Sequence, residues 1–216
     1  SKITISKSAF PAFCIYFFLS NAFLFGGSGF HSLILKSDGS LHAFGRNNYG
    51  QLGDGTNTSR STPTQILDSG VSQIASGERH SLIIKTDGSL HAFGRNNAGQ
   101  LGDGTTTDRN TPTQILASEV AQIAVGANHS LILKNDGSLY TFGNNSYGQL
   151  GDGTNTNRNT PTQILASGVS QIAAGIRHSL ILKFDGSLHT FGYNNYGQLG
   201  DGTTTNKNTP TQILAS

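Results

Sequence analysis

The fold is decided by the stretch HSLIIKTDGSLHAFGRNNAGQLGDGT, which runs from His80 to Thr105. Parts of this stretch recur along the chain, and each copy begins 49 residues after the one before it. The tripeptide His-Ser-Leu begins at His31, His80, His129 and His178. Gly-Asp-Gly-Thr begins at Gly53, Gly102, Gly151 and Gly200, and Thr-Pro-Thr-Gln-Ile-Leu begins at Thr62, Thr111, Thr160 and Thr209. A fixed period of this length indicates a repeat architecture in which each unit packs against its neighbours.

Each repeat contains four short segments that favour β-strands. In the first repeat these are residues 31–36, 40–44, 64–67 and 71–75. The first two are joined through Asp38-Gly39, a dipeptide typical of tight hairpin turns. The polar, glycine-rich residues 45–62 that follow are expected to form an ordered loop. Pro63 is expected at the entrance of a strand, where its missing N–H costs little.

Both faces of the predicted hairpin are apolar. Alternation assigns Leu33, Leu35 and Phe44 to one face and Ile34, Leu41 and Ala43 to the other. A sheet without a polar face has to be covered on both sides, and a unit of 49 residues is too small to bury an adequate core alone. Four-stranded sheets stacked radially form a β-propeller. We therefore predict an all-β propeller with about four blades present.

Composition supports the all-β class and excludes several functions. The chain has 28 glycines in 216 residues, and only 12% of its residues are charged against about a quarter in typical proteins. Its formal net charge of +2, without a Lys/Arg cluster, makes nucleic acid an unexpected partner. Cys14 is the only cysteine, so the chain can form neither an intrachain disulfide nor a thiolate metal site.

The stretch from His80 to Thr105 resembles the repeat of the regulator of chromosome condensation family. The resemblance covers residues 30–216, with units starting near residues 31, 80, 129 and 178 and with matching glycines. It implies a propeller that usually has about seven blades. A chain of just under four units is therefore expected to be a fragment. The alternative is that it closes by pairing with a second copy through exposed strand edges.

The resemblance also implies functions that this chain does not fully match. The founding member is a guanine-nucleotide exchange factor for a small GTPase and also binds chromatin. Exchange there depends on a β-wedge inserted into one blade, whereas the unbroken spacing here leaves no room for a wedge, and the basic N-terminal arm used on chromatin is absent. Phenylalanine stands where the family often has tryptophan, a packing substitution at Phe44, Phe93, Phe142 and Phe191.

Residues 1–29 do not match the repeat. Residues 9–25 form an apolar run preceded by Lys2 and Lys7, and Ser20-Asn21-Ala22 has the small residues expected of a cleavage site, so residues 1–22 fit a secretory signal peptide. One alternative is a membrane anchor, for which the run is short. The other is a degenerate strand, with residues 22–25 supplying the inner strand of the first blade. The protein is secreted or at the cell surface in the first case, and otherwise cytoplasmic.

Three columns of residues invite a metal site, and we expect none of them to be one. The histidines that begin each repeat are expected to be structural and hydrogen-bonded, and the second histidine column is interrupted by Tyr140. The Gly-Asp-Gly-Thr loops supply one carboxylate each, too few for calcium, and fit tight turns instead. These loop carboxylates are Asp54, Asp103, Asp152 and Asp201.

We also expect neither catalysis nor a cofactor. An active site needs one set of distinct groups that breaks the repeat symmetry. Glu78 and Glu119 are the only glutamates and lie at non-equivalent positions, and no nucleophile stands beside a base.

Two sets of loop residues are the candidates for binding a protein partner. One cation per repeat occupies the same loop position and would suit a partner with an acidic surface. This set is Arg60, Arg109, Arg158 and Lys207. The second set varies between repeats and is rich in arginine and tyrosine, which are common anchors of interfaces. It contains Arg46, Arg95, Tyr193, Tyr49, Tyr147 and Tyr196.

The leading functional hypothesis is a non-catalytic scaffold that binds a protein through its blade loops. Nucleotide exchange on a small GTPase, implied by the family resemblance, is the second hypothesis. A secreted or surface-attached binding protein is the third.

Overall fold

The computed structural model describes residues 13–16, 23–27 and 29–215, and these residues form 17 β-strands in four antiparallel sheets. The first sheet has β1 (Phe13–Tyr16), β2 (Phe23–Gly27), β3 (His31–Lys36), β4 (Leu41–Gly45) and β5 (Arg60–Leu67). The second has β6 (Val71–Ser76), β7 (His80–Lys85), β8 (Leu90–Gly94) and β9 (Arg109–Leu116). The third has β10 (Val120–Val125), β11 (His129–Lys134), β12 (Leu139–Gly143) and β13 (Arg158–Leu165). The fourth has β14 (Val169–Ala174), β15 (His178–Lys183), β16 (Leu188–Gly192) and β17 (Lys207–Leu214).

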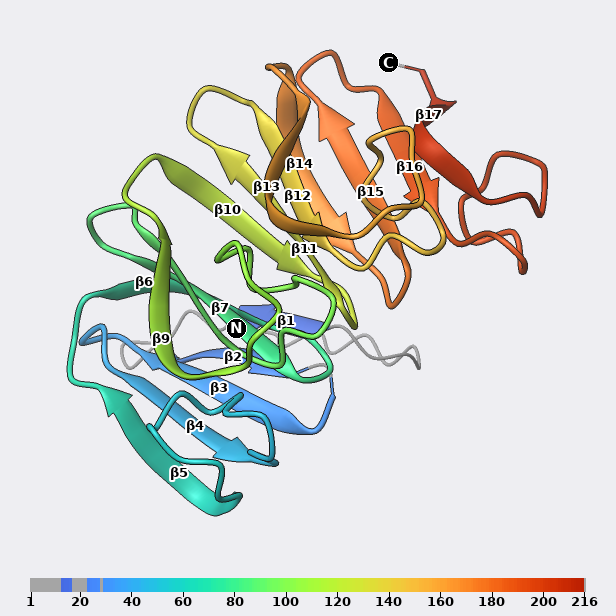
Figure 1. Ribbon diagram of the computed structural model, residues 1–216. Helices are drawn as coiled ribbons and strands as arrows, with labels where there is room; N and C mark the ends of the chain where they lie inside the picture. The colour runs from blue at the N-terminus through green and yellow to red at the C-terminus, as the bar shows by residue number, and fades with distance from the viewer. Residues whose placement is uncertain (1–12, 17–22, 28, 216) are drawn as a thin grey trace, which may run out of the picture.

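The four sheets are the blades of a propeller, numbered here blade 1 to blade 4. In each sheet the strands are ordered as in the sequence, so every blade is a simple meander. Strands β2, β6, β10 and β14 contact one another in turn, which places them at the axis, while β5, β9, β13 and β17 form the outer edges. Figure 1 shows the blades fanned in an arc. The predicted propeller architecture is therefore confirmed.

The outer strand differs from the prediction. It begins at Arg60 instead of Thr64, so Pro63 lies inside β5 and not at its entrance. The pairing of β4 with β5 shifts between Ala43 and Gly45, because Ala43 pairs with Thr64 and Gly45 pairs with Arg60. Pro63 therefore lies in the irregular part of an edge strand, where no partner needs its missing N–H.

The predicted division of the hairpin between two faces was also wrong. The register pairs Leu33 with Ala43 and Leu35 with Leu41, so these four share one face. Ile34 pairs with His42 and Ser32 with Phe44, which places Ile34 and Phe44 on the other face. The error arose because the tight turn sets which residues lie opposite each other, and alternation along a single strand does not reveal this offset.

The core consists of three layers, one between each pair of neighbouring blades. In the first layer the leucine face of blade 1 packs against Ile83 and Phe93 of blade 2. The second layer joins the corresponding face of blade 2 to Ile132 and Phe142 of blade 3. The third joins blade 3 to Ile181 and Phe191 of blade 4. Blades 2 and 3 thus each offer a leucine face to one neighbour and an isoleucine-phenylalanine face to the other.

A ladder of buried histidines also joins the blades. His31 Nε2 lies 2.7 Å from Ser81 Oγ of the next blade, and the serine hydroxyl lies 2.9 Å from the carbonyl oxygen of Gln51. Because the hydroxyl has one proton and donates it to that carbonyl, the imidazole Nε2–H donates to the serine. The same contacts join blades 2 and 3 and blades 3 and 4, through His80 with Ser130 and His129 with Ser179. The prediction of structural, hydrogen-bonded histidines is confirmed for these three.

The N-terminal prediction falls mostly on residues outside the described part of the chain, including the cleavage site at residues 20–22. Within the apolar run, β1 pairs with β2, and β2 pairs with β3. Phe23 lies opposite Lys36, so the expected inner strand of the first blade is present as β2. The described residues contain no helix long and apolar enough to cross a membrane.

The histidine ladder predicts a pH-dependent stability. Burial lowers the pKa of His31 to about 4 and the pKa values of His80 and His129 to about 3, whereas an unfolded histidine titrates near 6.5. Below about pH 6.5 the unfolded chain therefore binds more protons than the folded chain. The free energy of unfolding has its highest value above that pH and falls as the pH drops towards 4. Each histidine contributes a slope of up to about 1.4 kcal/mol per pH unit.

Urea unfolding measured at several pH values between about 7.5 and 4.5 checks this expectation. The lowered pKa values of the carboxylates act only below about pH 5, so the change in the midpoint between about pH 7.5 and pH 5 reports the histidines. A midpoint that stays constant across the window would contradict the role of the ladder.

A second prediction concerns the layers between blades. Gly102 has a φ of +75°, and a Cβ at this position would lie 2.9 Å from ring carbons of Phe142 in the next blade. Gly200, at the same place in the fourth repeat, has a φ of +71°, and its nearest contact would be Ile213 at 3.7 Å. Both alanine variants incur backbone strain of about 1 kcal/mol. Gly102→Ala also crowds the core, so it should lower the free energy of unfolding by about 1–3 kcal/mol more than Gly200→Ala. Equal losses in urea unfolding would count against close packing of the blades.

Candidate partner-binding surface

Each loop that leads to the outer strand of a blade (β5, β9, β13 or β17) is organised by one buried asparagine. In blade 1, Asn47 Nδ2 donates to the carbonyl oxygens of Thr56 and Thr58 and to Asp54 Oδ1, at 2.9–3.1 Å. Its Oδ1 accepts the amide of Leu52 at 2.9 Å. Asn96, Asn145 and Asn194 hold the other three loops through equivalent contacts. The glycine-rich loops are therefore ordered, as predicted.

The aspartate of each Gly-Asp-Gly-Thr motif is an internal acceptor. Asp54 Oδ1 accepts the backbone amide and the hydroxyl of Thr56, and Asp54 Oδ2 accepts Arg60 Nε at 2.8 Å. Burial alone would raise the pKa of Asp54, but these hydrogen bonds outweigh it and hold the pKa below its ordinary value. Among the described residues no three His, Cys, Asp or Glu side chains gather as metal ligands.

The first set of predicted partner-binding residues is engaged within its own loops. Arg60, Arg109 and Arg158 each approach the aspartate of the same loop with Nη2 at 2.7 Å, and Lys207 Nζ lies 3.3 Å from Asp201. Their side chains are about one-third exposed, while the aspartates are nearly buried. The structure thus gives these cations a role in holding the loop, and their contact with a partner stays a prediction.

The second predicted set lies at one end of the blades, here called the rim. In each blade the residue after β4, β8, β12 or β16 donates its backbone amide to the residue just before β3, β7, β11 or β15, as Arg46 does to Phe30 and Arg95 to Arg79. The arginines stack on aromatic rings: Arg79 lies 5.4 Å from the centre of the Phe30 ring and 5.6 Å from that of Tyr49, and Arg95 lies 5.1 Å from Tyr49. The structure therefore brings together Arg46, Tyr49 and Arg95 from the predicted set.

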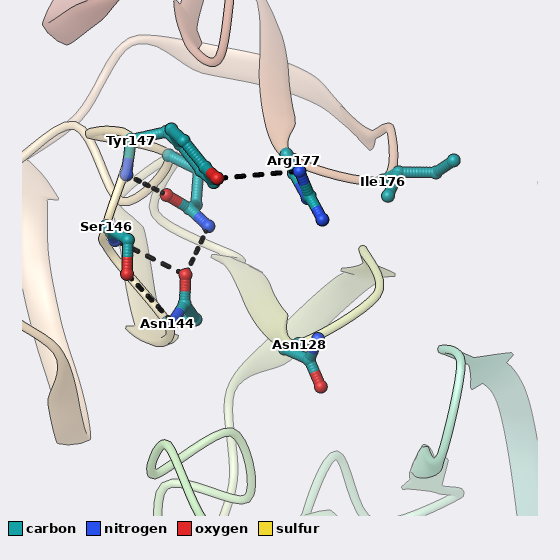
Figure 2. Close-up of a pocket in the computed structure, with 7 residues that line it drawn as sticks. Asn128, Asn144, Ser146, Tyr147, Ile176 and Arg177 are labelled. Carbon is teal, nitrogen blue, oxygen red and sulfur yellow. Dashed lines mark hydrogen bonds between the residues drawn. The ribbon is translucent and has the colours of Figure 1, made fainter.

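A second group on the rim joins blades 3 and 4. Arg177 stacks on Tyr147 at 5.3 Å and on Tyr193 at 5.9 Å, and Tyr193 also packs edge-on against Tyr147 and Tyr196. A pocket of about 230 Å³ adjoins this group and is lined by Tyr147, Asn144 and Arg177 among others. In Figure 2 the hydroxyl of Tyr147 points toward Arg177. Tyr196 is 86% exposed and is the most open aromatic ring of the set.

Sequence reasoning missed the position just before each histidine. It is occupied by Phe30, Arg79, Asn128 and Arg177. These residues complete the rim. The sequence does indicate the position, because its side chain changes between aromatic, cationic and amide from repeat to repeat. The position is easily overlooked because it directly precedes a strand whose residues are almost the same in every repeat.

Comparison with known proteins finds the same repeats elsewhere. A family model described as "RCC1-like domain" matches residues 27–216. The crystal structure of human WBSCR16 is 30% identical with a TM-score of 0.74, covering 86% of this chain and 50% of that chain. Prp20p from Saccharomyces cerevisiae is 25% identical with a TM-score of 0.77, covering 93% of this chain and 52% of that chain. A stretch of 66 residues, 28% of this chain, is 38% identical to 15% of the ultraviolet-B receptor UVR8 of Arabidopsis thaliana. This chain thus spans about half the length of the solved structures.

The loop geometry predicts that two adjacent asparagines differ sharply in importance. Asn47→Ala should lower the free energy of unfolding by about 2–3 kcal/mol, because it removes the partners of several buried backbone groups. Asn48 is exposed, so Asn48→Ala should change it by less than about 0.5 kcal/mol. Urea unfolding of both variants measures the difference, and similar losses would show that Asn47 does not anchor the loop.

Proposed function

Because this chain belongs to the RCC1-like domain family, we propose that it is a non-catalytic scaffold that holds a protein partner on its rim. The fold of this family supports a role in protein interaction or in nucleotide exchange. The structural report on Prp20p names its binding properties to Gsp1p and histones, which are proteins. A protein partner is therefore the expected ligand class for this propeller.

One observation carries the proposal, namely that repeats of almost the same sequence differ at adjacent positions of the rim. The two positions joined by the amide contact described above read Phe30 and Arg46 in blade 1, Arg79 and Arg95 in blade 2, Asn128 and Asn144 in blade 3, and Arg177 and Tyr193 in blade 4. The asparagines and aspartates that organise the loops are the same in every repeat. An invariant frame with a varied, solvent-facing rim is suited to recognising one asymmetric partner.

The absence of catalysis is also part of the proposal. The structure does contain serine hydroxyls beside imidazoles, which resembles the start of a nucleophilic dyad. Ser81, Ser130 and Ser179 are fully buried, however, and each donates its proton to a backbone carbonyl of the preceding blade. The pairs recur with the repeat and join blades, so they support a structural role.

A pull-down comparison tests the scaffold proposal. Replacing Arg46 and Tyr193 by alanine should release most of the bound partner, because aromatic and arginine anchors dominate interface energies. The matched control is Phe184→Ser at a hairpin turn, which removes a ring that is 74% exposed but outside the rim. Equal retention by both variants, or no partner retained by the folded protein, would overturn the proposal.

Nucleotide exchange is the competing function, and a release assay on a small GTPase distinguishes it. No acceleration is expected, and a clear acceleration would favour exchange over a passive scaffold. Two further hypotheses stay predictions. Secretion is tested by the N-terminus of the mature protein, and self-association through open strand edges by sedimentation at several concentrations.

A further inference from the structure

A glutamine just inside the rim recurs in every repeat and differs in how its amide is satisfied. Gln51, Gln100 and Gln149 each accept, through Oε1, a backbone amide two residues earlier, at 2.9–3.0 Å. The Nε2 of Gln149 donates to Asn144 at 2.8 Å, and the Nε2 of Gln100 reaches Asn97 and Asn128 at 3.4 Å. The Nε2 of Gln51 is buried and has no acceptor among the described residues.

The reason for this difference lies in the two rim positions next to each glutamine. Gln149 has Asn144 in its own blade, and Gln100 has Asn128 in the next blade. The corresponding positions around Gln51 are Arg46 and Arg79, which carry donors and no acceptor. Asn48, which stands where Asn97 does, is exposed, and Gln51 Nε2 is left without an acceptor.

Two more unpaired donors lie at the same place. Arg79 Nε and Arg95 Nε are buried, and neither has a hydrogen-bond partner within the described residues. They are neighbours, because the amide of Arg95 donates to the carbonyl of Arg79 at 2.9 Å and both guanidinium groups stack on Tyr49. A Cβ on Gly94, the residue before Arg95, would lie 3.1 Å from the Cα of Gln51. Three buried donors without an acceptor therefore belong to Gln51, Arg79 and Arg95, which adjoin Tyr49 between blades 1 and 2.

Unpaired buried donors are costly, so this arrangement favours a ligand that brings acceptors. Three arginines lie in this region, Arg46, Arg79 and Arg95. Among the described residues, Arg79 Nη2 forms an ion pair with the carboxylate of Glu78 at 3.2 Å. The excess of positive charge selects an anion, and guanidinium groups match carboxylates with two parallel hydrogen bonds.

Building on the scaffold function proposed above, we propose that the rim between blades 1 and 2 binds a carboxylate side chain from an acidic segment of the protein partner. The guanidinium groups of Arg79 and Arg95 donate to the carboxylate, and the rings of Phe30 and Tyr49 pack against the adjoining residues of the segment. A protein segment is favoured over nucleic acid because Glu78 lies in the site and the chain has a formal charge of only +2, which suits isolated carboxylates better than a continuous phosphate backbone.

Fluorescence anisotropy with a labelled tetraglutamate peptide tests the site on the full chain. Tetraglutamate should bind more tightly than tetraglutamine, and rising salt should weaken it. Arg79→Asn introduces the residue that blade 3 has at this position and supplies Gln51 with an internal acceptor. It should fold normally and weaken binding about tenfold, the loss expected for hydrogen bonds to a charged group. Arg95→Asn, which introduces the residue that blade 3 has as Asn144, is a second variant with the same expectation.

The matched control is Arg177→Asn, which removes the same charge from the same position of blade 4, where Gln149 is already satisfied. It should change the affinity by less than about twofold, because distant exposed charges are screened by salt. Equal losses in Arg79→Asn and Arg177→Asn would mean that net charge alone attracts the peptide and would overturn the proposal. So would equal binding of tetraglutamine, competition by inorganic phosphate at lower concentration than by glutamate peptide, or tighter binding of a labelled oligothymidylate.

The outcomes for this site and for the scaffold function are separable. If the protein retains its partner in the pull-down but does not bind tetraglutamate, the carboxylate site fails and the scaffold stands. If no partner is retained, the scaffold fails, and the peptide titration still measures the site directly.

Discussion

The structure depends on the need to cover two apolar faces on every blade. The leucine face of one blade, such as Leu82 and Ile84 of blade 2, is fully buried only because Ile132 and Phe142 of the next blade lie against it. A single repeat has too little core to fold alone, and burial of these side chains between blades supplies most of the driving force. Stability is therefore a property of neighbouring pairs and is distributed along the array.

Polar groups inside the array are satisfied by the same repetition. Buried histidines reach serines of the following blade, and in the loops the amide of Gly55 donates to the carbonyl of Asn110, whose side chain donates back to the carbonyl of Gly55. Leaving a buried polar group without a hydrogen bond destabilises the fold by more than one hydrogen bond stabilises it. These contacts therefore fix the position of each blade against the next. The layers between blades thus combine apolar packing with a specific set of hydrogen bonds.

The invariant contacts leave the rim free to vary. Loop shape is determined by the asparagine and the aspartate, so Arg79 can replace Asn128 or Phe30 at the same position without changing the frame. Some substitutions leave donors without acceptors, as around Gln51, while others restore them, as around Gln149. Differences in function along the array therefore come from a few side chains on a common scaffold.

The sequence by itself determined the blade, because the period, the turn dipeptides and the apolar runs are local, and it also identified Arg46, Tyr49 and Arg95 as variable rim residues. Tertiary structure decided what required knowing which residues lie opposite each other: the faces of the hairpin, the place of Pro63 within an edge strand, and the ion pair of Arg60 with Asp54. The three unpaired donors around Tyr49 belong to two blades. Whether these donors lie in one region depends on how one repeat packs on the next. A sequence pattern within one repeat carries no information about that packing.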